Sequence, residues 1–222
     1  MSHAVVGLTE AERAAAGGDP QEVKVLYLAH CTRDKGVFDA LQGVAAANRR
    51  LRQRQAPLSL RLLVAGGFVR AAEKAEFEQR LAEPGMAEMV QYLGFVSGEQ
   101  KNQLLREADL FCFPTYYENE NQPVNLIEAM AYGLPILTTR WRSLPELFPA
   151  NYPGLVRARS PEQVADRLVA LTMTETGEMF RETFTRHYTM ERHLTALAEA
   201  ITQLEAAPSP GVAAPAARVF PQ

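Results

Sequence analysis

The sequence predicts an α/β fold, in which a doubly wound, mostly parallel β-sheet is covered by helices on both faces. Short apolar runs rich in strand-forming residues alternate along the chain with longer segments whose apolar residues recur at helical spacing. Strands that alternate with helices form parallel sheets, because a parallel connection needs a crossover long enough to hold a helix. The composition agrees with one large globular domain, since 47% of the 222 residues are hydrophobic and 22% are charged.

The first strand is predicted at residues 23–29, a short apolar run between Asp19-Pro20 and a polar turn. A leader over residues 1–21 precedes this strand. The leader contains a short helical piece at residues 9–16, which the capping box Thr9-x-x-Glu12 would open.

A helix is predicted from about Lys35, because the apolar residues between Val37 and Leu51 fall near helical spacing. The second strand covers residues 58–65 and ends at Gly66-Gly67. The next predicted elements are a charged helix over 70–83, a short strand over 89–93 and a helix that the capping box Ser97-x-x-Gln100 opens.

A strand at residues 110–113 and a helix at 124–132 enclose a polar loop over 115–122. The remaining predicted elements are a strand at 135–138, a short segment around Leu144, a strand at 155–156 and helices from Ser160, over 175–186 and over 190–204. The sequence Ser-Pro-Glu-Gln from Ser160 is a strong helix start, with Ser at the cap, Pro in the first turn and Gln at the third position. We find no internal repeat.

Several function classes are excluded. A formal net charge of -3 argues against a general nucleic-acid binder, and no apolar run is long enough to span a membrane. Cys31 and Cys112 are expected to be reduced core residues of a cytosolic protein. The glycine motifs of dinucleotide-binding proteins and P-loop proteins, the serine elbow of hydrolases and metal-ligand spacings of histidine are all missing.

The polar loop and the helix after it carry the richest set of candidate residues. Glu118 and Glu120 lie on the loop, and Glu128 lies one turn inside the helix, so Glu120 and Glu128 should sit at the carboxyl edge of the sheet. Carboxylates there can accept hydrogen bonds from sugar hydroxyls, and the helix N-terminus near Val124 suits a phosphate. The alternative is that the loop glutamates are solvated and that Glu128 has only a structural role.

The loop after the first strand is the second candidate. Lys35 can hold a phosphate as a point charge, Gly36 lets backbone come close, and Arg33 could assist. Taken alone, a lysine at a solvated helix start and a packed His30 at the strand end are the simpler interpretations. No metal or cofactor is expected, because Lys35 and the helix N-terminus could neutralise a diphosphate without a divalent ion.

The segment from Phe113 to Pro135 resembles the signature of the retaining GT-B glycosyltransferases of family four. In that family a loop glutamate and a helix glutamate are separated by seven residues and followed by Ala-Met-Ala and Gly-x-Pro, as they are here. The resemblance extends to Asp34-Lys35-Gly36, Gly66-Gly67 and residues 92–96, and covers about residues 22–200. It implies one Rossmann-like half of a GT-B fold.

The resemblance also implies roles for the candidate residues. Lys35 would bind the diphosphate of a nucleotide-sugar donor, Glu120 would contact the transferred sugar, and Glu128 would hold the ribose hydroxyls. The backbone around Asn121, Pro123 and Val124 would hold the sugar and the distal phosphate. Backbone near Phe95 and Val96 would contact the base. Glu120 is therefore the expected catalytic residue, and the others are expected donor-binding residues.

Two positions depart from the family pattern. His30 stands where family members usually carry an arginine, so the second phosphate cation would have to be a protonated His30 or Arg33. Gln122 replaces the aromatic residue that usually follows the first glutamate two positions later. Neither change breaks the pair formed by Glu120 and Glu128.

The leading hypothesis is a donor-binding domain of a retaining glycosyltransferase that moves a hexose or related sugar to a glycan or lipid-linked acceptor. The alternative is a non-catalytic nucleotide-sugar-binding module that regulates or scaffolds. The expected partners are the donor and an N-terminal acceptor-binding domain that this chain lacks, in a cytoplasmic enzyme whose membrane association would come from that domain. The expected organisation is a leader or interdomain connection at 1–21, a nucleotide-sugar-binding domain at 22–175, C-terminal helices at 176–205 and a disordered tail at 206–222.

Overall fold

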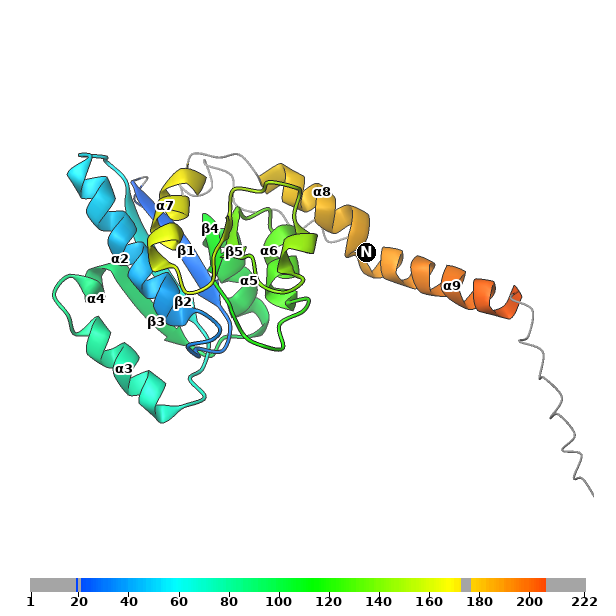
Figure 1. Ribbon diagram of the computed structural model, residues 1–222, viewed down its shortest axis with the longest axis horizontal. Coiled ribbons are helices and arrows are strands. Elements are labelled where there is room, and N and C mark those ends of the chain that lie inside the picture. Colours follow the sequence, from blue (N-terminus) through cyan, green and yellow to red (C-terminus); the bar gives the residue numbers. More distant parts are fainter. Residues whose placement is uncertain (1–18, 20, 173–176, 207–222) are drawn as a thin grey trace, which may run out of the picture. The chain divides into compact units, whose positions relative to one another are not determined.

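The computed structural model describes residue 19, residues 21–172 and residues 177–206 (Figure 1). In this part of the chain six strands form one sheet in the order β3-β2-β1-β4-β5-β6, and every neighbouring pair is parallel. The strands are β1 (Glu22–Leu28), β2 (Ser59–Ala65), β3 (Val90–Gly94), β4 (Leu110–Phe113), β5 (Ile136–Thr139) and β6 (Leu155–Val156). The doubly wound parallel sheet is therefore confirmed.

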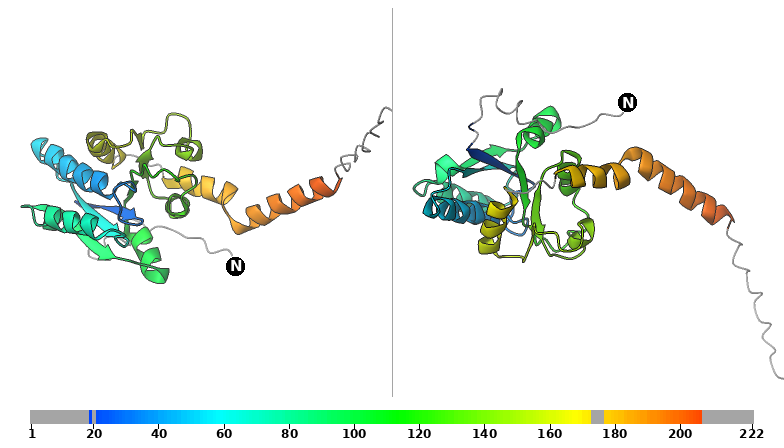
Figure 2. Two further views of the ribbon diagram at one scale, coloured as in Figure 1. Left: turned by 60° about the horizontal axis from the view of Figure 1, so that its bottom comes forward. Right: turned by 90° about the horizontal axis from the view of Figure 1, so that it is seen from above.

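Helices cover both faces of this sheet. Helices α2 and α7 pack against each other on one face, and α5 lies on the opposite face (Figure 2). The helices are α2 (Val37–Gln53), α3 (Ala71–Leu81), α4 (Met86–Met89), α5 (Gly98–Glu107), α6 (Val124–Ala131), the 3-10 helix η1 (Leu144–Leu147), α7 (Pro161–Leu171), α8 (Gly177–His187) and α9 (Met190–Ala206).

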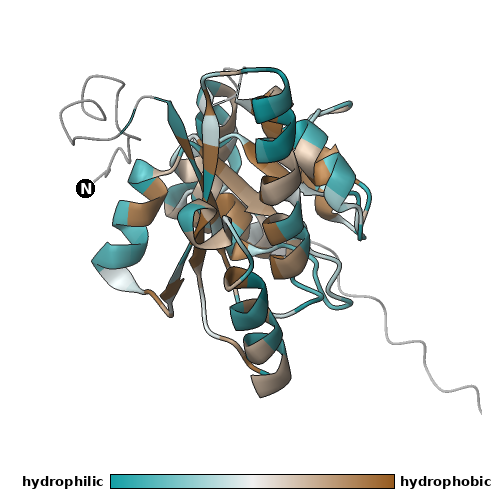
Figure 3. Cartoon of the chain, turned by 90° about the vertical axis from the view of Figure 1, so that its left-hand side faces the viewer, coloured by the Kyte–Doolittle hydropathy of each residue, from teal (hydrophilic) through white to brown (hydrophobic). Residues whose placement is uncertain are grey.

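The core lies along the central strands. The last four residues of β1 and all four residues of β4 are buried, as expected for strands covered on both faces. Hydrophobic residues accordingly gather on the strands and hydrophilic residues on the outer sides of the helices (Figure 3). The buried Asn48 ties α2 to β2, since its Nδ2 donates to Leu60 O and its Oδ1 accepts from Leu60 N, each at 2.8 Å.

The chain divides into two compact units, residues 1–185 and residues 186–222. The first unit includes most of α8, whose Phe180 is buried against the rings of Phe148 and Tyr152. In the second unit α9 exposes large apolar side chains at regular spacing: Met190, Leu194, Leu197, Ile201 and Leu204.

The helix starts differ from their predicted chemistry. Ser97 and Ser160 do precede α5 and α7, but neither side chain makes a capping hydrogen bond. Ser160 Oγ instead donates to Ala158 O at 3.3 Å, and Gln163 Oε1 accepts from Arg157 N at 2.9 Å. Both predicted caps are therefore wrong, because the side chains that would form them bond to the preceding loop or find no helix amide.

One short helix was not predicted. Helix α4 ends at Met89, so the strand predicted at 89–93 overlaps it by one residue and β3 begins one residue later than predicted. The helix predicted at 9–16, the leader apart from residues 19 and 21, and the tail at 207–222 lie outside the described residues. Among the helices that the structure describes, none combines the length and the apolar character that a membrane crossing needs.

Candidate functional site

The predicted site lies where the strand order reverses. Strands β1, β2 and β3 make up one half of the sheet, and β4, β5 and β6 make up the other half. The two halves meet where β1 pairs with β4. The loops that leave neighbouring strands at such a reversal open a crevice beyond their carboxyl ends. The loop after β1 carries Lys35 and the loop after β4 carries Glu120.

Lys35 and Glu120 form a close ion pair. Lys35 Nζ lies 2.7 Å from Glu120 Oε2, and the side chains are 20% and 8% exposed. The buried Thr115 donates its hydroxyl to the same carboxylate oxygen at 3.2 Å, and Lys35 Nζ lies 4.3 Å from the centre of the Tyr117 ring. Glu120 is thus not a solvated loop charge, whereas the side chain of Glu118 is 83% exposed.

Backbone contacts hold the two loops together. Gly36 has a left-handed conformation with φ of 85°, and a Cβ atom there would lie 2.3 Å from Pro114 O. Tyr116 N donates to Asp34 O at 2.7 Å. The hydroxyl of the buried Tyr27 donates to His30 O at 2.9 Å, with Lys35 O at 3.3 Å. The close approach that Gly36 permits is therefore an approach between the two loops.

Helix α6 and the residues just before it carry further predicted residues of the site. Glu128 lies one turn inside it, as predicted, and forms an ion pair with Lys101 of α5. In the first turn of α6, Asn125 Nδ2 donates to Leu28 O at 2.8 Å, while its buried Oδ1 has no hydrogen-bond partner. At the start of the helix Asn121 and Val124 are exposed and Pro123 is buried.

Three other predicted donor-binding residues are Arg33, Phe95 and Val96. The guanidinium of Arg33 forms an ion pair with Glu76 of the neighbouring α3 and lies 4.4 Å from the centre of the Phe38 ring. His30 is exposed, so the interpretation of His30 as a packed residue is wrong. Phe95, directly after β3, is 75% exposed, whereas Val96 is only 6% exposed.

Burial controls the protonation of the nearby groups. Cys31 and Cys112 are free and buried, as predicted. Burial raises the pKa of the Cys31 thiol to about 12 and raises that of Cys112 as well. Burial also raises the pKa of Tyr27, so its hydroxyl remains a donor to the Lys35 loop at neutral pH.

The sequence and the fold also match a described family. The family described as "Glycosyl transferases group 1" matches residues 9–183. This chain belongs to the group 1 glycosyltransferases. It is similar to several curated relatives. One is the amylovoran biosynthesis glycosyltransferase AmsK of Erwinia amylovora, which is 29% identical over 157 residues. The D-inositol 3-phosphate glycosyltransferase of Corynebacterium jeikeium is 31% identical over 162 residues.

These matches span 69% and 71% of the group 1 chain, but only 36% and 37% of the respective relatives. The chain thus spans less than half the length of these relatives.

Solved structures support the fold. The C-terminal domain of LpcC from Francisella tularensis aligns with a TM-score of 0.68 at 18% identity, over 84% of this chain and 97% of that domain. Anabaena Alr3699/HepE in complex with UDP aligns with a TM-score of 0.73 at 15% identity, over 90% and 54%.

Three contacts at the site of this group 1 chain were missed from its sequence. Thr115 and Tyr117 flank Glu120 within the loop that the sequence singles out, so the loop itself was the available signal. Lys101 carried no such signal, because it comes from a different helix and meets Glu128 only through the tertiary fold.

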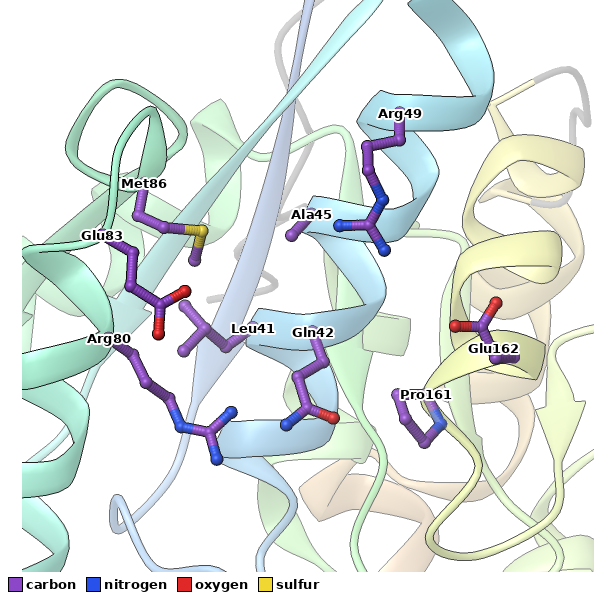
Figure 4. Close-up of a pocket in the computed structure, with 9 residues that line it drawn as sticks. All are labelled: Leu41, Gln42, Ala45, Arg49, Arg80, Glu83, Met86, Pro161 and Glu162. Carbon is purple, nitrogen blue, oxygen red and sulfur yellow. The ribbon is translucent and has the colours of Figure 1, made fainter. Parts of the chain in front are cut away.

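A cavity of about 270 Å³ lies elsewhere in the group 1 chain, between α2, the end of α3 and the start of α7 (Figure 4). None of the predicted site residues lines it. Its lining residues are Leu41, Gln42, Ala45, Arg49, Arg80, Glu83, Met86, Pro161 and Glu162. Within the described residues, no group of three or more His, Cys, Asp or Glu side chains has the proximity that a metal ion needs.

Proposed function

We propose that this chain is the donor-binding domain of a retaining glycosyltransferase that transfers a sugar from a nucleoside diphosphate to a glycan or lipid-linked acceptor. The observation that supports this most directly is the ion pair of Lys35 and Glu120 at 2.7 Å, which joins the loops after β1 and β4. It places a cation and a carboxylate beside the start of α6, which suits a donor with an anionic diphosphate and a neutral sugar.

Each residue has a proposed role in holding the donor. Lys35 binds the diphosphate together with the amides at the start of α6, around Asn121, Pro123 and Val124. Glu120 turns from Lys35 to the sugar hydroxyls, and Glu128 accepts hydrogen bonds from the ribose. The backbone of the loop that follows β3 contacts the base. Phe95 in this loop is 75% exposed, which agrees with a loop that a ligand can reach.

The proposed chemistry retains the configuration of the anomeric carbon. The bond between this carbon and the diphosphate oxygen breaks, and its electron pair stays on the diphosphate. The acceptor oxygen bonds to the same face of the carbon and gives its proton to the leaving diphosphate. Lys35 and the α6 dipole stabilise the negative charge that grows there, and we propose that no metal is required.

Transfer would require an acceptor-binding domain in addition to this chain. Two observations support this proposal: the chain spans 36% and 37% of two relatives, and α9 exposes an apolar row suited to packing on another domain. The free, buried cysteines agree with a cytoplasmic location for the enzyme.

Calorimetry with uridine and guanosine diphosphates and their sugar conjugates tests donor binding. We expect one of them to bind, and Lys35→Ala and Glu128→Ala each to weaken that binding at least about tenfold, or about 1.4 kcal/mol. Lys24→Ala is the matched control, because Lys24 is also partly buried and paired, with Glu107 at 3.9 Å. Binding of none of these ligands, or equal binding by all variants, would sink the proposal.

Catalysis is tested in the enzyme that also carries the acceptor-binding domain. We expect Glu120→Gln to lower turnover at least about a hundredfold, because the amide cannot accept sugar hydrogen bonds as the carboxylate does. Unchanged turnover would show that another residue contacts the sugar. Donor binding without any donor hydrolysis or transfer in that enzyme would favour the regulatory or scaffolding alternative. The observation that supports this alternative is His30, which stands where family members usually carry an arginine.

A further inference from the structure

Four arginines follow the last two strands of the sheet. Arg140 and Arg142 come directly after β5, and Arg157 and Arg159 come directly after β6, so an Arg-x-Arg sequence stands at each carboxyl end. All four residues are exposed. We refer to them together as the arginine quartet.

The sheet brings the two Arg-x-Arg sequences side by side. Thr138 and Thr139 pair with Leu155 and Val156, and the hydrogen bond from Arg140 N to Val156 O at 2.7 Å continues this pairing. Arg140 and Arg157 therefore occupy neighbouring positions at the same edge of the sheet as Lys35 and Glu120.

The positive charge of the quartet is only partly balanced. Arg142 approaches Glu118 at 3.8 Å. Within the described part of the chain, Arg140 and Arg157 have no carboxylate within salt-bridge distance. Neighbouring cations of this kind repel each other unless an anion lies between them.

The second arginine of each sequence has a strained backbone. Arg142 and Arg159 have φ of 46° and 55°, in the left-handed region of backbone conformation that residues other than glycine rarely adopt. Both reach the loop that carries Glu120: Arg142 reaches Glu118, and the Arg159 guanidinium lies 4.7 Å from the centre of the Tyr116 ring. Strain of this kind is concentrated at functional sites.

We propose that the arginine quartet binds the phosphate or diphosphate group of the acceptor substrate. Arginine forks match phosphate oxygens in a bidentate way, and two adjacent forks suit a group with several such oxygens. The role as acceptor site rests on the proposed function. Contacts to the Glu120 loop place a bound acceptor phosphate beside the sugar that would be transferred.

The test uses inorganic pyrophosphate and the fluorescence of Trp141, the one tryptophan of the chain, which lies between Arg140 and Arg142. The background is Lys35→Ala, which weakens anion binding at the proposed donor phosphate site. We expect a saturable change in emission at constant ionic strength. The double variant Arg140→Gln with Arg157→Gln should weaken this binding at least about tenfold.

The matched control is Arg52→Gln with Arg54→Gln, a third exposed Arg-x-Arg at the end of α2, which removes the same charge. An equal loss of affinity in both double variants, or no saturable response, would overturn the proposal. A second arm replaces pyrophosphate with phosphatidylglycerol vesicles and with neutral phosphatidylcholine vesicles. Binding to the anionic vesicles alone, without a pyrophosphate response, would assign the quartet to a membrane and equally overturn it.

Uridine and guanosine diphosphates, titrated against the chain with Lys35 intact, separate this proposal from the donor proposal. We expect the double variant in the quartet to leave that affinity unchanged. Failure of both diphosphates to bind, with an intact pyrophosphate response, would remove the donor assignment and leave the anion site in place.

Discussion

Gly36 has a left-handed backbone, and a Cβ atom there would lie 2.3 Å from the carbonyl oxygen of Pro114. We expect Gly36→Ala to lower the free energy of unfolding by at least about 2 kcal/mol, because backbone strain adds to a clash with backbone that cannot move aside. Urea denaturation measures the change. Gly67→Ala is the control, since nothing lies within 4 Å of its added Cβ atom, and equal losses in both variants would contradict the prediction.

The same residue shows what sequence reasoning can and cannot see. The glycine was correctly identified as a point of close approach, but the sequence suggested a phosphate as its neighbour. The structure shows Pro114, which a local pattern could not identify because the contact joins the loops after β1 and β4.

The two thiols provide a second prediction at this scale. Burial raises the pKa of Cys31 to about 12 and also raises that of Cys112, so neither forms the reactive thiolate near neutral pH. We expect neither thiol to react with a disulfide reagent at about pH 8 in the folded protein. Both should react in denaturant. Rapid labelling of the folded chain would contradict this prediction, because it would mean that the core around Cys31 and Cys112 opens often.

Among the elements, α2 and β2 depend on one polar side chain. Asn48 is 3% exposed and satisfies both backbone groups of Leu60. We expect Asn48→Ala to lower the free energy of unfolding by about 2–4 kcal/mol, because it leaves two buried backbone groups unpaired. Asn102→Ala should cost less than about 1 kcal/mol, since its hydrogen bond to Glu99 is exposed and 3.5 Å long. Similar losses in the two variants would contradict this account.

Elements were predicted more accurately than the contacts between them. Strands β4 and β6 match their predicted bounds, because a compact apolar run between polar loops leaves little choice of where the strand begins and ends. The caps at Ser97 and Ser160 were wrong, because a short hydroxyl side chain has several backbone partners within reach. The sequence identified Lys35, Glu120 and Glu128 as candidate residues and also the loop that carries Thr115, whereas Lys101 is brought to Glu128 by packing alone.

At the scale of the whole molecule, Asp39 couples stability to pH. It is 9% exposed, and its burial raises the pKa of the carboxyl group, although Arg33 and Arg159 oppose the shift. The folded protein therefore holds this proton at pH values where the unfolded chain has lost it. The contribution of Asp39 to stability falls as pH rises from the unfolded to the folded pKa.

Asp39→Asn removes this titration. We expect the variant to gain stability relative to the wild-type chain as pH rises from about 3 to about 7, and the two to differ least in acid. Denaturant midpoints measured across that range provide the comparison. Parallel pH profiles for the two proteins would contradict the assignment to Asp39.

The hydrogen bonds of Tyr27 have a consequence for how the site responds to heat. One fully buried phenol lies within hydrogen-bond distance of the carbonyls of His30 and Lys35, so both ends of the loop that carries Lys35 are held by the protein interior. Warming should therefore not loosen this loop gradually, as it would a loop held only by surface contacts. The proposed binding of donor phosphates by Lys35 should therefore persist until the core unfolds and be lost in the same cooperative step.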